Sequence, residues 1–209
     1  MGLNVVENYG WTTAAPTHAS TYITPAILEL VARLGVKKIA DVGSGNGALC
    51  ADLARAGATP VGIEYDHAGV TLARQTHPAI RFYQAGVQDD PEKILAAEGL
   101  FDAVLSVEVI EHLFSPHLLP LFARQLLKPD GYLIITTPYH GFLKNLALSL
   151  ADKWDDHHTA LWHGGHIKFW SRRTLSRLLT DHEFSSVSFH GVGRVPYLWK
   201  SMVLVARKC

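Results

Sequence analysis

A glycine-rich segment is the part of this sequence whose residue types and spacing most clearly indicate chemistry. Asp41 ends an apolar run, and the loop that follows contains Gly43, Gly45 and Gly47. Glycine permits positive φ and a close approach of backbone N–H groups to a ligand. Dinucleotide loops have the spacing G-x-G-x-x-G, whereas this loop has G-x-G-x-G, and the carboxylate of Asp41 would repel a pyrophosphate. The segment therefore predicts a site for a ligand that carries an ammonium or a sulfonium group.

Three side chains of the metal-ligand type occur shortly after another apolar run, residues 101–106. They are Glu108, Glu111 and His112, and on a helical turn the i,i+3 and i,i+4 spacings would place them on one face. Two carboxylates and an imidazole suit a divalent cation such as Mg²⁺ that keeps open positions for substrate oxygens. Alternatively, the carboxylates only complement the helix macrodipole. The spacing leaves both interpretations open.

Imidazole and indole side chains are crowded between residues 138 and 170. The chain has 12 histidines, and this stretch holds the following rings: Trp154, His157, His158, Trp162, His163, His166 and Trp170. Such a surface suits a planar or partly apolar acceptor, with a histidine available to take a hydroxyl proton near neutral pH. Alternatively, the rings only pack on the rest of the domain.

The elements that must position these residues alternate along the chain. We expect strands at 37–42, 60–64, 80–84, 101–106, 132–137, 187–190 and 201–206, and helices at 24–34, 48–56, 67–76, 91–98, 116–127 and 172–179. This alternation predicts an α/β fold of three layers, with a Rossmann-like, mostly parallel seven-stranded sheet. The last strand should be antiparallel because no helix separates it from the strand before it. Ser115 and Ser171 are expected N-caps, and Gly35, Gly57 and Gly99 are expected helix stops.

Length, charge and hydropathy exclude several classes of protein. The chain has 209 residues, which is enough for one domain, and we expect this domain at 24–209 with a covering segment at 1–23 and a lid insertion at 138–170. The formal net charge is zero. Because the net charge is zero, the overall electrostatic field of the protein does not attract a polyanion, which disfavours a nucleic-acid partner. No long apolar run or secretory signal is present, which disfavours membrane insertion. With only Cys50 and Cys209, the sequence favours a reducing, cytoplasmic location.

The loop from Asp41 to Gly47, followed by Glu64 at the end of the second predicted strand, resembles class I S-adenosylmethionine (SAM)-dependent methyltransferases. The resemblance implies that Gly43, Ser44, Gly45, Asn46 and Gly47 lie along the cofactor and that Glu64 accepts both ribose hydroxyls. It also implies further cofactor contacts at Tyr65, which would pack on the adenine, and at Val87, Gln88, Val107 and Trp11. An acidic residue of the family's adenine site is replaced here by Gly86.

Residues 108–112 resemble the Glu-x-x-Glu-His segment of ubiquinone-biosynthesis O-methyltransferases and of RNA 3′-terminal 2′-O-methyltransferases. That resemblance implies a divalent cation held by Glu108, Glu111 and His112. Residues 165–170 resemble a His-Lys-Phe segment that supplies another ligand in the RNA enzymes, with one residue inserted. His112 and His166 are accordingly the candidates for removing the acceptor's proton.

The combined expectation is methyl transfer from SAM to a small-molecule acceptor, at a hydroxyl oxygen. Three alternatives remain open on the sequence alone. They are an RNA 3′-terminal 2′-O-methyltransferase, a nicotinamide-dependent oxidoreductase, and a SAM-binding module without catalysis.

Overall fold

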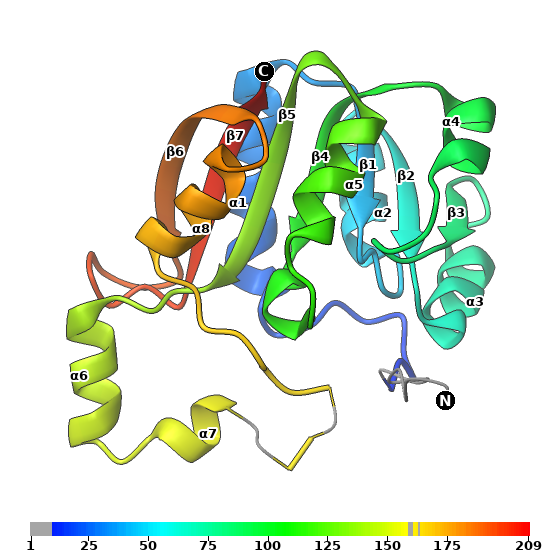
Figure 1. The fold of residues 1–209 in the computed structure, drawn as a ribbon. Helices are drawn as coiled ribbons and strands as arrows, with labels where there is room; N and C mark the ends of the chain where they lie inside the picture. The colour runs from blue at the N-terminus through cyan, green and yellow to red at the C-terminus, as the bar shows by residue number, and fades with distance from the viewer. Residues whose placement is uncertain (1–9, 159–160, 163) are drawn as a thin grey trace, which may run out of the picture.

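The computed structural model describes residues 10–158, 161–162 and 164–209, and it contains the predicted seven-stranded sheet. In the order β3-β2-β1-β4-β5-β7-β6 the strands are Arg81–Gln84, Thr59–Glu64, Lys38–Val42, Phe101–Val107, Leu127–Pro138, Ser201–Lys208 and Phe184–Val192 (Figure 1). β7 is antiparallel to both β5 and β6, and the other neighbours are parallel. The predicted fold class and the antiparallel last strand are therefore confirmed.

Most of the helices cover the two faces of this sheet and bury its apolar side chains, whereas α6 and α7 lie at its carboxyl edge. In chain order they are α1 Ser20–Leu34, α2 Ala48–Arg55, α3 His67–Thr76, α4 Glu92–Glu98, α5 Leu118–Leu126, α6 Phe142–Leu150, α7 Trp154–His158 and α8 Arg172–Thr180. α4, α5 and α8 pack on one face, and α1, α2 and α3 pack on the other. Burying apolar side chains between such layers stabilises the domain by about 25 cal/mol per Å² of apolar surface.

Local signals were correct at several helix ends, but α1 begins at Ser20 rather than at residue 24. Ser171 caps α8 through a capping box with Thr174, and Gly35 ends α1 in the left-handed conformation. The expected cap at Ser115 is wrong, because α5 begins at Leu118 after His117, with no side-chain cap. β5 also begins earlier than expected, at Leu127, because Leu127 pairs with Phe101 before a register shift.

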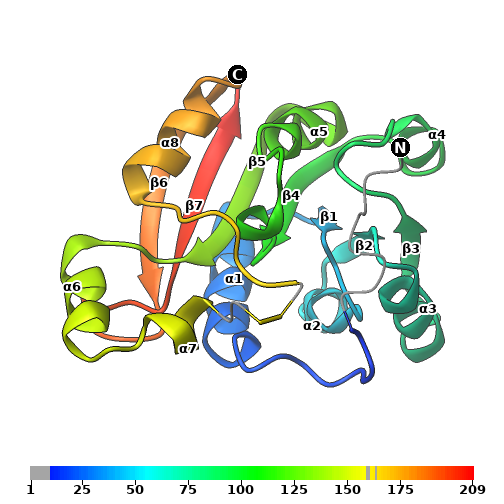
Figure 2. The ribbon, with the colours of Figure 1, turned by 60° about the horizontal axis from the view of Figure 1, so that its bottom comes forward.

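The carboxyl ends of the parallel strands meet at one edge of the sheet, at the bottom of Figure 1, and this edge comes forward in Figure 2. Three segments lie there. They are the N-terminal residues 10–19, the segment 139–170 that contains α6 and α7, and the β6–β7 connection. The expected covering segment 1–23 is thus described only from residue 10 onward. Among the described residues, no helix is both long and apolar enough to span a bilayer.

Packing at the centre of the sheet gives a test of this architecture. Ile134 of β5 is fully buried, whereas Leu121 of α5 is 39% exposed. Replacing Ile134 by alanine leaves a cavity among side chains that cannot fully collapse, so we expect the free energy of unfolding to fall by about 2–5 kcal/mol. Leu121→Ala should change it far less. Urea denaturation measures both, and equal losses would contradict the burial described here.

Candidate functional site

The glycine loop lies between β1 and α2 at the carboxyl edge of the sheet. Gly43, Gly45 and Gly47 have φ of 83°, 53° and 78°, a region that residues with a Cβ rarely adopt. The N–H groups of Gly43 and Ser44 both donate to the carbonyl of Ile63, at 2.8 and 3.2 Å, which ties the loop to β2. A Cβ at position 43 would lie 2.3 Å from a methyl group of Val109, and one at position 45 would lie 2.3 Å from the Trp11 ring. The loop therefore requires glycine both for its backbone conformation and for close packing.

Asp41 lies beneath the loop rather than on its surface. Its side chain is 1% exposed, and the Cys50 thiol donates to its Oδ2 at 3.4 Å, while Oδ1 has no hydrogen-bond partner among the described residues. Burial, and then the nearby Glu64 carboxylate, raise the pKa of Asp41 to about 7. The sequence predicted a carboxylate that faces the ligand, whereas the structure buries the carboxylate of Asp41 under the loop.

Glu64 ends β2 and joins the loop to the start of α3. Its Oε2 accepts from the N–H of Gly45 and its Oε1 from the N–H of Asp66, both at 2.7 Å. Burial raises the pKa of Glu64, and the two backbone N–H groups oppose that rise. Each carboxylate oxygen has two lone pairs, so Glu64 can accept further hydrogen bonds from a ligand's hydroxyls while it holds the loop.

A cavity of about 300 Å³ has Tyr65, the residue that follows Glu64, in its lining. The other lining residues are His67, Gln84, Ala85 and Asp89, and Val87 and Gln88 are not among them. Asp89 returns to the cavity because its Oδ2 accepts from the N–H of Gly86 at 2.8 Å. Asp89 was not among the residues expected from the sequence. An acidic residue three positions after the atypical Gly86 was the available signal.

The N-terminal segment is fastened to the glycine loop. Asn46 donates through Nδ2 to the carbonyls of Thr13 and Ala15, at 3.0 and 2.9 Å, and Trp11 lies on Gly45. Asn46 therefore anchors the covering segment instead of facing a ligand. Ser44 is different, since its buried hydroxyl has no hydrogen-bond partner among the described residues.

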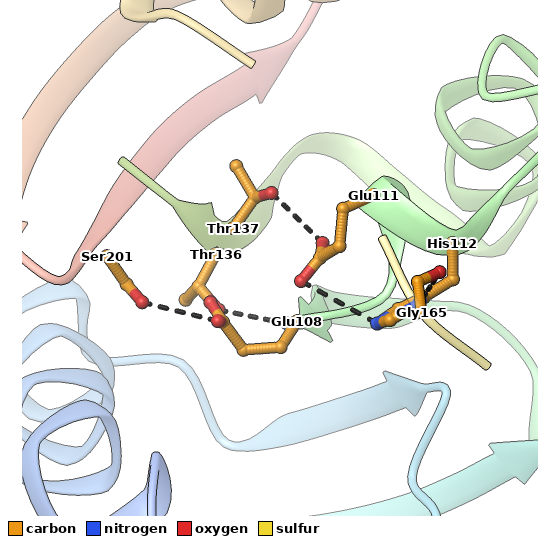
Figure 3. Close-up of polar contacts among 7 residues, drawn as sticks. All are labelled: Glu108, Glu111, His112, Thr136, Thr137, Gly165 and Ser201. Carbon is orange, nitrogen blue, oxygen red and sulfur yellow. Dashed lines mark hydrogen bonds and ion pairs between the residues drawn. The ribbon is translucent and has the colours of Figure 1, made fainter. Parts of the chain in front are cut away.

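Glu108 follows β4, after Val107, and has a positive φ of 54°. Only Ile110–His112 form a helical turn, so Glu108 does not share a helical face with Glu111 and His112 as the sequence suggested. It instead accepts hydrogen bonds from the hydroxyls of Thr136, at 2.9 Å, and Ser201, at 3.2 Å (Figure 3). Burial raises the pKa of Glu108 to about 7.

Glu111, His112 and His166 form the group that could hold a metal ion, with ligand atoms all within 4.8 Å of one another. Nδ1 of His112 donates to the carbonyl of Gly165 at 3.2 Å, which makes Nε2 the nitrogen that faces Glu111. Thr137 donates to Oε2 of Glu111 at 3.0 Å. Oε1 of Glu111 and Nδ1 of His166 are buried without a hydrogen-bond partner among the described residues.

The segment 139–170 brings His166 to this group. The N–H groups of Ile167 and Lys168 donate to the carbonyl of Glu111 at 2.9 and 3.0 Å. Burial, and then the imidazoles of His112 and His158, lower the pKa of His166 to about 4. His157 and His158 of α7 pack with the rings of Trp154 and Phe169 on the same segment, whereas His163 is outside the described residues.

The family model of the methyltransferase domain matches residues 17–188 of this chain. The ubiquinone biosynthesis O-methyltransferase of Roseobacter denitrificans is 38% identical over 105 residues, which are 48% of this chain and 40% of that protein. The protein of the same name from Bradyrhizobium diazoefficiens is 27% identical over 174 residues, 78% of this chain and 64% of that protein. The chain thus spans less than two thirds of the length of either curated relative.

A solved structure with the same fold is the magnesium protoporphyrin IX methyltransferase of Synechocystis PCC 6803 with bound S-adenosylhomocysteine (SAH). The TM-score is 0.64 at 17% identity, and the match covers 90% of this chain and 82% of the other. At this identity the likeness shows the fold alone.

The buried carboxyl of Asp41 gives a prediction on stability and pH. Its pKa is about 7 in the folded chain and near 4 when unfolded, so between these values the folded state holds a proton that the unfolded state releases. Stability from this group is present below pH 4 and is lost as the pH rises through 7. Because asparagine cannot ionise, we expect Asp41→Asn to gain about 2–4 kcal/mol of unfolding free energy relative to the parent between pH 4.5 and pH 8.

Urea denaturation of both chains across that pH range measures the difference. The exposed Asp155→Asn is the matched control, because it removes no buried charge. Parallel curves for the parent and Asp41→Asn would show that Asp41 ionises freely in the folded state.

Proposed function

The chain belongs to the methyltransferase domain family, and we propose on this premise that it transfers the methyl group of SAM to a hydroxyl oxygen of a small acceptor. The observation that carries the proposal is the carboxylate of Glu64, which holds the glycine loop and directly precedes Tyr65 in the cavity lining. A carboxylate there can accept hydrogen bonds from both ribose hydroxyls, while the cavity receives the adenine. The methionine part then lies along the loop, towards Val107 at the end of β4.

The reaction is a direct displacement. A lone pair of the acceptor oxygen forms the new bond to the methyl carbon as the bond from that carbon to sulfur breaks, so the sulfonium becomes the thioether of SAH. Alignment of the oxygen with the methyl group supplies much of the rate. When no cation occupies this group, the proton of the hydroxyl passes to a neutral imidazole, His112 or His166, since burial lowers the pKa of both rings and leaves them uncharged at neutral pH.

The acceptor's apolar part has a matching surface at this edge. Large apolar side chains are exposed on α6 and on the β6–β7 connection, namely Phe142, Leu143, Leu146, Leu150, Val195 and Tyr197. Two curated relatives are named for ubiquinone biosynthesis, which also favours an acceptor with an apolar part. An aromatic hydroxyl compound is the acceptor class that this surface supports best.

A divalent cation fits the group of Glu111, His112 and His166. The fit rests on two buried atoms that have no hydrogen-bond partner in the described part of the chain, Oε1 of Glu111 and Nδ1 of His166, and on the carbonyl of Gly165 that orients His112. A set with two imidazoles suits Mn²⁺, Co²⁺ or Zn²⁺ better than Mg²⁺. Such an ion supplies positive charge that stabilises an ionised acceptor oxygen. Glu108 remains outside this set because its oxygens accept from Thr136 and Ser201.

The two alternative enzyme functions are not favoured. A nicotinamide-dependent oxidoreductase does not agree with the match to the methyltransferase model. The curated relatives described above are named for a small-molecule pathway rather than for RNA. A cytoplasmic location remains part of the proposal, and the free thiols of Cys50 and Cys209 support it, since reducing compartments keep thiols unpaired.

Binding of SAH tests the cofactor site. Glu64→Ala removes an acceptor of two charge-assisted hydrogen bonds, so we expect SAH affinity to fall at least about tenfold by isothermal calorimetry. Glu64→Gln keeps the size of the side chain and removes its charge. It therefore distinguishes loss of the charge-assisted hydrogen bonds to SAH from disruption of the glycine loop. The exposed Glu92→Ala on α4 is the control and should bind like the parent. The proposed function fails if the parent does not bind SAH or if Glu64→Ala binds it equally well.

Titration with Mn²⁺ tests the cation site without any need for an acceptor. We expect the parent to bind one ion in calorimetry and His166→Ala to lose at least about tenfold in affinity. Glu108→Gln should bind nearly as well as the parent, because Glu108 is outside the ligand set. His190→Gln, on β6, is the distant control. A loss with Glu108→Gln and none with His166→Ala would instead support the ligand set expected from sequence.

A further inference from the structure

Three cationic side chains, one from α6 and two from the β6–β7 connection, lie close together at the same edge of the sheet, beside Tyr22 of α1. We call Lys144 of α6, Arg194 of the β6–β7 connection and Lys200 the cationic group. Nζ of Lys144 donates to the carbonyl of Lys200 at 3.0 Å, and Nζ of Lys200 lies 4.9 Å from the centre of the Tyr22 ring. A Cβ at Gly193 would lie 2.9 Å from both Tyr22 and Lys200, so the chain passes close to them just before Arg194.

Among the acidic side chains, Glu108 is the one whose charge acts on Lys144 of the cationic group. None of its members takes part in the ion pairs found among the described residues. Lys144 is 6% exposed, and burial lowers its pKa to about 8, with Arg194 adding to the decrease and Glu108 opposing it. Its ammonium has three N–H donors, and the one described hydrogen bond from them goes to a neutral carbonyl. The oxygens of Glu108 already accept hydrogen bonds from Thr136 and Ser201, so a ligand anion bound directly to the ammonium would add a compensation that this buried charge lacks.

Glu108 links the cationic group to the place of methyl transfer. Its Oε2 accepts from Ser201, which directly follows Lys200, and its backbone N–H is held by Thr136 of β5. In the sheet order the glycine loop follows β1, the cationic group lies at the start of β7, and the ends of β4 and β5 lie between them. An acceptor over β4 and β5 would therefore have the cofactor on one side and the cationic group on the other.

We propose that the methyl acceptor carries an anionic group, a carboxylate or a phosphate, which Lys144, Arg194 and Lys200 bind. This inference rests on the proposed function and names the acceptor class for the same site. The anion gives the buried ammonium of Lys144 a counter-charge and fixes the end of the acceptor away from SAM. The hydroxyl then lies toward the methyl group.

Binding of matched probes to the SAH complex tests the proposal. The probes are 3,4-dihydroxybenzoate, 4-hydroxyphenyl phosphate and the neutral 3,4-dihydroxybenzamide, measured by ligand-observed NMR at millimolar concentrations. We expect at least one anionic probe to bind about tenfold more tightly than the amide, since a charge-assisted hydrogen bond contributes about that factor or more. The tighter of the two anions identifies the carboxylate or the phosphate as the source.

Variants of the cationic group complete the test. Lys144→Met should reduce the preference for the anion to about twofold or less while SAH binding stays unchanged. Because Lys144 is buried, Lys200→Met and the exposed Arg194→Gln provide the same test if Lys144→Met does not fold. Lys153→Met, an exposed lysine paired with Asp156 in the same segment, is the control and should keep the preference.

The outcomes separate this inference from the proposed function. If the parent binds SAH but binds neither anion, or binds the anions no better than the amide, the anionic acceptor is wrong and methyl transfer from SAM stands. A preference that persists in all three variants would also overturn the inference. Failure of the parent to bind SAH would instead remove the premise.

Discussion

Burial of carboxyl groups at one edge of the sheet is the constraint on which the rest of this site depends. Four acidic side chains share this environment, and burial raises the pKa of each: Asp41, Glu64, Glu108 and Glu111. Negative charge in such surroundings is costly unless hydrogen-bond donors or positive charge compensate it. Backbone N–H groups compensate Glu64, and hydroxyl groups compensate Glu108 and Glu111. In the proposed reaction the sulfonium of SAM and a divalent cation supply the positive charge.

The sign of the charged side chains also changes along this edge of the sheet. Carboxyl groups predominate from β1 to β5, whereas the cationic group lies beyond β5, where β7 begins. Charged ligands are oriented by such a separation because each end of the ligand meets opposite charge. In the proposed reaction, the cofactor therefore lies at the glycine loop and Glu64, and the anionic end of the acceptor lies toward Lys144.

The segment between β5 and α8 serves both ends of this arrangement. Its first helix carries Lys144, which reaches the carbonyl of Lys200, and its last residues carry His166 to Glu111. The intervening rings, including those of Trp154 and His158, pack on one another within the segment. A connection of this length in a compact domain usually has a functional role. Here it supplies one side chain toward the acceptor and one toward the proposed cation.

The sequence alone determined the fold class, the glycine loop, the position of Glu64 at the end of β2 and the antiparallel last strand. These features depend on local patterns, such as the alternation of strand and helix or a spacing of glycines, and each pattern has a local physical cause. Tertiary structure decided where side chains point. A single positive φ turns Glu108 toward Ser201, and the hydrogen bonds to the carbonyl of Glu111 bring His166 beside it across more than 50 residues of chain. Asn46 holds the N-terminal segment for the same reason: its partners are set by packing between distant segments, which no local pattern records.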